Sequence, residues 1–125
     1  MNIKNILHVS VISTNIDRTK AFYEGVLDLP LSPHRPAMSF AGVWYELGGN
    51  QQLHILCLPN PEAGLHRPAH GGRDRHIALG VDSLDALCRK LDQAGVSYTL
   101  SRSGRPALFC RDPDDNALEF VQTGD

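Results

Sequence analysis

Two similar stretches of this sequence, HVSVISTNID (8–17) and HIALGVDSLD (76–85), decide its fold. Each begins with a histidine, continues as an alternating strand and then offers polar residues that can cap a helix. The second stretch starts 68 residues after the first, and the chain continues in a similar way after both. An internal repeat of this size indicates a duplicated supersecondary unit, so we expect two copies of one unit that opens with a strand and a helix.

Both copies are predicted to continue with three more strands. Helices are expected over 16–27, capped by Thr14 or Asn15, and over 84–94, capped by Asp82 or Ser83. The predicted later strands are 36–41, 42–48 and 51–58 in the first copy, and 97–102, 105–111 and 116–122 in the second. GGN (48–50) and DPDDN (112–116) supply the hairpin turns. Each copy is therefore predicted to be a βαβββ unit, which makes the fold class α+β, with mixed, mostly antiparallel sheet.

The composition limits the class of protein. The chain has 125 residues, a net charge of −2 and 42% hydrophobic residues, which is typical of a single globular domain. No basic surface points to nucleic acid, and no apolar run is long enough for a membrane span or signal peptide. Three cysteines without a CxxC pair are expected to be reduced, buried thiols of a cytoplasmic protein.

A segment rich in proline, glycine, arginine and histidine separates the two copies. We expect the first copy over about 5–58, this connection over 59–75 and the second copy over about 76–123. Arg73 and Arg75 lie at its end and are candidates to bind an anionic substrate. The alternative is a solvated loop whose charges serve only solubility.

Four polar residues interrupt predicted strands in matching places of the two copies. His8 and His76 open the first strand of each copy, whereas His54 and Glu119 lie in the last strand of each. Side chains alternate faces along a strand, and each of these four lies opposite the apolar residues of its own strand. If duplication brings them to one concave centre, they form a candidate ligand set.

Three imidazoles and one carboxylate are donors that suit a divalent transition metal. Taken singly, each histidine is more often an ordinary strand residue than a ligand. As a set in register with the repeat, the four favour one divalent ion such as Fe, Ni, Zn, Mn or Co.

The repeat and the motifs FYEGVLDL (22–29) and DPDDNALEF (112–120) resemble the vicinal oxygen chelate superfamily, which includes glyoxalase I, extradiol dioxygenases and bleomycin-resistance proteins. This resemblance implies a glyoxalase-like half-barrel arrangement with helices on the outer face. It also implies that the four ligand places are His8, His54, His76 and Glu119. The place held by His54 is often Glu or Gln in the family and can be a non-ligand. Asp28 and Asp115 replace the family's usual glycines, and we expect positive φ at both.

The resemblance implies an enzyme whose metal chelates two neighbouring oxygens of a small substrate. The metal would stabilise charge on an enediolate, alkoxide or peroxo species, with Glu119 and His54 as the residues able to move protons. Trp44 and Tyr45 must face opposite sides of their strand, so one of them is a candidate to line the substrate pocket, and we expect Trp44 there.

Three classes of function stay open at this point. The first is a metal-dependent lyase, isomerase or dioxygenase, which we favour. The second is a metal-free binding protein of the bleomycin-resistance type that sequesters a small molecule. The third is a thiol transferase similar to the fosfomycin-resistance proteins. Relatives of this length commonly form dimers, so we expect a homodimer. The metal ligands can come from one chain or from both chains.

Overall fold

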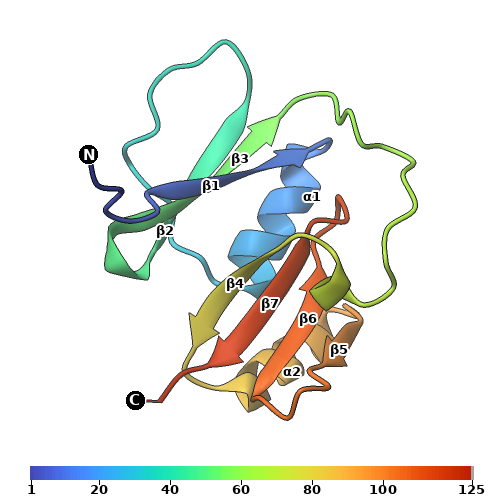
Figure 1. Cartoon of the computed structure of the whole chain (residues 1–125). Helices are drawn as coiled ribbons and strands as arrows, with labels where there is room; N and C mark the ends of the chain where they lie inside the picture. The colour runs from blue at the N-terminus through green and yellow to red at the C-terminus, as the bar shows by residue number, and fades with distance from the viewer. Residues whose placement is uncertain (125) are drawn as a thin grey trace. The chain divides into compact units, whose positions relative to one another are not determined.

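The computed structural model describes residues 1–124 and divides them into two compact units (Figure 1). The first unit spans Met1–Pro61 and the second begins at Glu62. Each unit contains a β-sheet of its own and one α-helix. Antiparallel pairings (β2–β3, β5–β6 and β6–β7) outnumber the parallel ones (β1–β3 and β4–β7), as the sequence predicts.

The first unit contains a three-stranded sheet in the order β1-β3-β2. Its elements are β1 (His8–Ser13), α1 (Ile16–Lys20), the π-helical segment η1 (Ala21–Val26), β2 (Gly42–Leu47), the 3₁₀ turn η2 (Gly48–Asn50) and β3 (Gln51–Cys57). The cap of α1 is Asn15, whose side-chain oxygen accepts a hydrogen bond from the backbone N–H of Arg18 at 3.0 Å. The helical segment ends just before Asp28, which has the expected positive φ, +56°.

The strand predicted over 36–41 does not form, and this corrects the expected βαβββ order of the first unit. The segment before β2 contributes only an isolated bridge between Leu31 and Tyr45. Pro33 and Pro36 have no N–H to donate to a neighbouring strand. The carbonyl of Phe40 accepts instead from the Arg35 guanidinium at 2.7 Å. The missing proline N–H groups and the hydrogen bond from Arg35 to Phe40 favour a loop, although the hydrophobic pattern alone predicted a strand.

The second unit is the complete βαβββ arrangement. It contains the 3₁₀ turn η3 (Gly71–Arg73), β4 (His76–Val81), α2 (Leu84–Gln93), β5 (Tyr98–Leu100), β6 (Ala107–Arg111) and β7 (Ala117–Gln122). The sheet order is β4-β7-β6-β5. Ser83 caps α2 by accepting from the N–H of Ala86 at 3.1 Å, and α2 packs on β7. Asp115, in the turn before β7, has φ +66°, as expected from the sequence.

Each unit buries an apolar core beside its sheet. Its largest fully buried side chains are Tyr23, Tyr45, Leu53 and Ile55 in the first unit, and Leu91, Leu108 and Leu118 in the second. Tyr45 is fully buried whereas Trp44 is only half-buried, which confirms that these two neighbours face opposite sides of β2.

The three cysteines are free thiols, as predicted, although only Cys110 is buried. Over residues 1–124, no helix is both long enough and apolar enough to cross a membrane.

Candidate metal centre

The second unit brings His76 and Glu119 together on one face of its sheet. β4 and β7 run parallel, and Ala78 lies opposite Glu119, so His76 shares a face with that carboxylate. His76 Nε2 lies 3.1 Å from Glu119 Oε1. Glu119 is the acidic residue of β7. It is only 4% exposed, so this carboxylate depends on the partners that the fold provides.

The backbone determines which nitrogen His76 presents to Glu119. His76 Nδ1 lies 2.8 Å from the carbonyl oxygen of Asp74. A carbonyl can only accept, so Nδ1 carries the proton, and in the neutral ring Nε2 has a bare lone pair. Nε2 and Oε1 are then two electron-pair donors that face each other. Only a cation between them, a proton or a metal ion, makes such a contact favourable.

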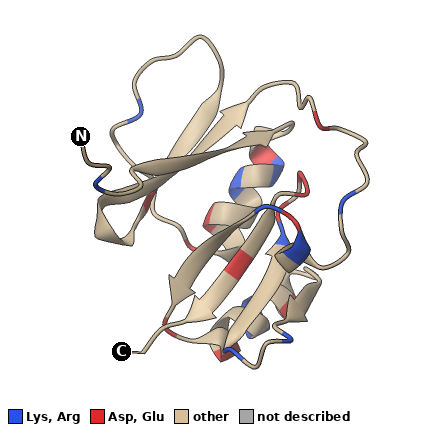
Figure 2. Cartoon of the chain, in the orientation of Figure 1, with Lys and Arg blue, Asp and Glu red and all other residues tan. Residues whose placement is uncertain are grey.

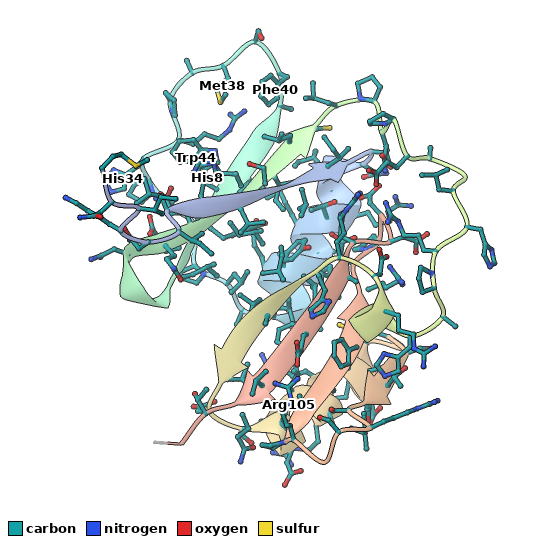
Figure 3. The ribbon with its side chains drawn as sticks, viewed as in Figure 1. His8, His34, Met38, Phe40, Trp44 and Arg105 are labelled. Atoms are coloured by element: carbon teal, nitrogen blue, oxygen red, sulfur yellow. The ribbon has the colours of Figure 1, made fainter. Side chains whose placement is uncertain are left out.

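The other oxygen of Glu119 has its own partner. Arg105 Nη2 donates to Glu119 Oε2 at 2.6 Å, from the loop that precedes β6 (Figure 3). The ring of Phe109, which lies opposite Glu119 on β6, meets the His76 ring edge-on with centroids 5.4 Å apart. The two carboxylate oxygens therefore lie in different environments, one beside His76 Nε2 and one beside a guanidinium.

The first unit brings His8 and His54 together in a stack of three rings. The His8 and His54 ring centroids are 4.0 Å apart, and those of Trp44 and His54 are 3.8 Å apart and almost parallel. His8 and Trp44 are both labelled on this unit in Figure 3. The stack follows from the strand register, because His54 lies opposite Ser10 of β1 and Trp44 of β2.

A short chain of hydrogen bonds orients the His54 ring. Gln52 Nε2 donates to Glu46 Oε1 at 3.0 Å, so the amide oxygen of Gln52 accepts from His54 Nε2 at 2.9 Å. The bare nitrogen of His54 is therefore Nδ1. Burial lowers the pKa of His54 and the nearby His8 lowers it further, while Glu46 acts in the opposite direction. The ring is therefore neutral at pH 7, which is the form that can bind a metal or accept a proton.

Each unit thus contains two of the four predicted ligands, on the same face of its sheet. Among the described residues 1–124, no group of three or more His, Cys, Asp or Glu side chains within either unit could hold a metal. The pairs are His8 with His54 and His76 with Glu119. A four-ligand centre would therefore need a contribution from both kinds of unit, and that set stays a prediction.

Two arginines of the connection, Arg67 and Arg75, form ion pairs. Figure 2 colours the basic and acidic residues along this segment. Arg67 and Arg75 both pair with Glu62. Arg67 and Arg111 also pair with Asp74, and the Arg111 hydrogen bond, first among several causes, lowers the pKa of that carboxyl. Arg73 is exposed. These pairs contact the side chain of Asp74, whose backbone carbonyl accepts from His76 Nδ1. Substrate binding by Arg73 and Arg75 stays a prediction.

A hollow of about 320 Å³ lies in the second unit, and neither His76 nor Glu119 is among its lining residues. It is lined by Ala69, Gly71, Val96, Ser97, Tyr98, Thr99, Phe109, Cys110, Arg111, Asp112 and Asp115. Burial, with a smaller contribution from Asp112, raises the pKa of Cys110 to about 12. A thiol that stays protonated is neither a good nucleophile nor a good ligand, so this hollow lacks a reactive group of that kind.

Sequence reasoning overlooked three supporting residues. Gln52 could have been found, because it lies two residues from His54 and so on the same face of β3. Asp74 acts through its backbone carbonyl, which leaves no trace in residue type. Arg105 reaches Glu119 only because of the β6–β7 pairing, so spacing along the chain gives no signal for it.

Comparison with known proteins agrees with the fold. Residues 5–120 match the model of the Glyoxalase/Bleomycin resistance protein/Dioxygenase superfamily. Glyoxylase I 4 of Arabidopsis thaliana is 29% identical over 96% of this chain and 71% of its own length. Lactoylglutathione lyase of Haemophilus influenzae is 29% identical over 94% of this chain and 91% of its own.

A solved structure from Bacillus anthracis, whose name places it in the glyoxalase family, has a TM-score of 0.76 and 25% identity, with 98% of both chains covered. The family match extends over almost the whole chain and includes all four candidate ligands. The chain belongs to the Glyoxalase/Bleomycin resistance protein/Dioxygenase superfamily.

Proposed function

We propose that this chain is a divalent-metal-dependent enzyme of the glyoxalase type that acts on a small substrate with two adjacent oxygens. The observation that carries the proposal is the contact between His76 and Glu119 in the second unit. His76 Nδ1 donates to the Asp74 carbonyl at 2.8 Å, and Nε2 lies 3.1 Å from Glu119 Oε1. A histidine whose far nitrogen donates to a backbone carbonyl has the outer hydrogen bond that is typical of metal-binding imidazoles.

The donor set fits a divalent transition metal. His76 Nε2 and Glu119 Oε1 would hold it from the second unit, and His8 and His54 from the first, where His54 offers Nδ1. When bound, the metal supplies positive charge that attracts two neighbouring oxygens of the substrate and stabilises the negative charge that develops on them.

The protein's own groups supply the proton transfer. Glu119 is the one carboxylate of the proposed set and is our candidate proton acceptor. His54, neutral at pH 7 because burial lowers its pKa, is the second candidate. Trp44 lies flat against the His54 ring and, as an aromatic wall, would restrict water and bind the apolar part of a substrate.

Among the enzyme classes, we propose a lyase or isomerase in preference to a dioxygenase. Relatives at 29% identity are named Glyoxylase I 4 and lactoylglutathione lyase. A metal-free binding protein is the alternative class, in which a proton between His76 Nε2 and Glu119 Oε1 would join the two side chains as an ion pair.

Turnover assays under controlled oxygen distinguish these classes. The purified protein, loaded with Ni²⁺, Co²⁺, Zn²⁺, Fe²⁺ or Mn²⁺, is supplied with hemithioacetals, acyl-CoA epimers or catechols. We expect turnover of a hemithioacetal or acyl-CoA without oxygen, loss of that turnover after chelation and recovery on adding metal back. Oxygen uptake with a catechol would favour a dioxygenase, and tight binding of small molecules without any metal dependence would favour a sequestering protein. His66→Gln, an exposed histidine of the connection, is the matched control for the ligand variants.

A further inference from the structure

We propose that Arg105 is a positioning residue that fixes Glu119 so that Oε1 alone is presented to the metal. This inference rests on the proposed metal-binding function. The two oxygens of Glu119 are divided between two partners, His76 Nε2 on Oε1 at 3.1 Å and Arg105 Nη2 on Oε2 at 2.6 Å. A carboxylate that binds metal through one oxygen leaves the other for an outer hydrogen bond. Arg105 already occupies that outer position.

The burial of the two groups makes this interaction directional. The side chain of Glu119 is 5% exposed, whereas that of Arg105 is 55% exposed. The carboxylate is therefore fixed within its strand, and the guanidinium approaches from the solvent side. A buried carboxylate with a charged donor loses much of its freedom to rotate, so the orientation of Oε1 depends on the contact to Oε2.

The loop around Arg105 supports its side chain in this position. Arg105 Nε donates to Ser103 Oγ at 3.2 Å, and the hydroxyls of Ser103 and Ser101 are 2.8 Å apart. The next residue, Pro106, accepts from the N–H of Gln122 at 2.8 Å, which joins the loop to the end of β7. The guanidinium is thus held by the loop on one side and by Glu119 on the other.

A second role for Arg105 predicts the opposite result. If the guanidinium only occupied the place of the metal, its removal would free Glu119 and metal would bind more tightly. The geometry opposes this role, because Arg105 contacts Oε2 whereas His76 Nε2 faces Oε1. The sign of the change in metal affinity therefore separates the two roles.

Metal titration of the full-length protein tests the proposal. The metal-free wild type, Arg105→Ala, Arg105→Lys and the control Arg102→Ala are titrated with Co²⁺ and Zn²⁺ against a competing chelator, and the Co²⁺ absorption spectrum is recorded. Arg102 is an exposed arginine of the same loop, so its replacement removes the same charge. We expect Arg105→Ala to bind metal about 10- to 100-fold more weakly and to shift the Co²⁺ spectrum. Arg105→Lys, which keeps a charged donor, should recover most of the affinity, and Arg102→Ala should match the wild type.

Unchanged or tighter binding by Arg105→Ala would overturn the positioning role, and so would an equal loss in Arg102→Ala. If the wild type itself binds neither ion, the proposed function fails, and this inference fails with it. Circular dichroism of each variant confirms that a loss of affinity does not reflect a loss of fold.

Discussion

A histidine that binds metal must present an unprotonated nitrogen, and in this chain neighbouring acceptors select that nitrogen for two of the four candidates. The Asp74 carbonyl accepts a hydrogen bond from His76 Nδ1, and the Gln52 amide oxygen accepts one from His54 Nε2. The residue types were predictable from the interrupted strand pattern. The tautomers were not, because one depends on a backbone carbonyl and the other on an amide whose orientation Glu46 determines.

The protonation of His54 leads to a prediction about stability and pH. Burial and the nearby His8 depress its pKa in the folded state, so the unfolded chain binds this proton more readily. Stability therefore falls as the pH drops through the unfolded value of about 6.5. The lowered pKa of Asp74 affects stability only at more acidic pH.

We expect the wild type to lose more stability between pH 7.5 and pH 5.5 than His54→Gln, which has no titrating ring. Urea unfolding midpoints at the two pH values, with His66→Gln as the control, provide the measurement. Equal losses in the wild type and His54→Gln would show that the His54 ring is readily protonated in the folded protein.

At the level of elements, the turn before β7 explains how Glu119 enters its strand in the correct register. Asp112 is buried, and its Oδ1 accepts from the backbone N–H groups of Asp114 and Asn116 at 2.9 and 3.0 Å. Asp115 then has φ +66°. A one-residue slip would move Glu119 to the opposite face, so the turn is part of the site.

The positive φ of Asp115 predicts an order of stability among substitutions. Glycine adopts this conformation without steric cost, whereas alanine loses about 1 kcal/mol or more. We expect Asp115→Gly to be more stable than Asp115→Ala by about that amount in urea unfolding. At Asp114, which has no positive φ, the order should reverse. A variant pair at Asp115 in which alanine is at least as stable as glycine would contradict the turn geometry.

Most elements were predictable because periodicity, caps and turn residues agree with one another. The second unit formed all its predicted strands, and Asn15 and Ser83 cap the two helices. The strand predicted over 36–41 was wrong. Its apolar residues favoured a strand in the sequence pattern, but the prolines cannot donate the backbone hydrogen bonds that a strand needs. The π-helical segment η1 has no signal in hydrophobic periodicity either.

At the level of the whole molecule, the sheet of each unit has two edge strands, β1 and β2 in the first and β4 and β5 in the second. The edge of β2 is partly covered by the bridge between Leu31 and Tyr45. The first unit also exposes several large apolar side chains, namely Met1, Ile3, Ile6, Leu7, Leu31 and Met38. Open edges and exposed apolar groups favour association. The division of the four candidate ligands between the two units could be predicted from the repeat, whereas their convergence on one centre stays a prediction.

We therefore predict a homodimer in solution. Multi-angle light scattering should give twice the 13.7 kDa of the chain at micromolar concentration. A mass of one chain across the concentration range would contradict the prediction and would require the two units of one chain to cover each other's open edges.

The most direct test of the proposed metal centre is the metal content and metal affinity of the wild type, four ligand variants and one control variant. The protein is purified without added metal, its metal is determined by elemental analysis, and the metal-free form is titrated with Zn²⁺ and Co²⁺. We predict one tightly bound divalent ion per chain, and a strong loss of affinity in His8→Gln, His54→Gln, His76→Gln and Glu119→Gln but not in His66→Gln. A wild type that neither carries nor takes up metal, or ligand variants that bind as tightly as the control, would contradict the account.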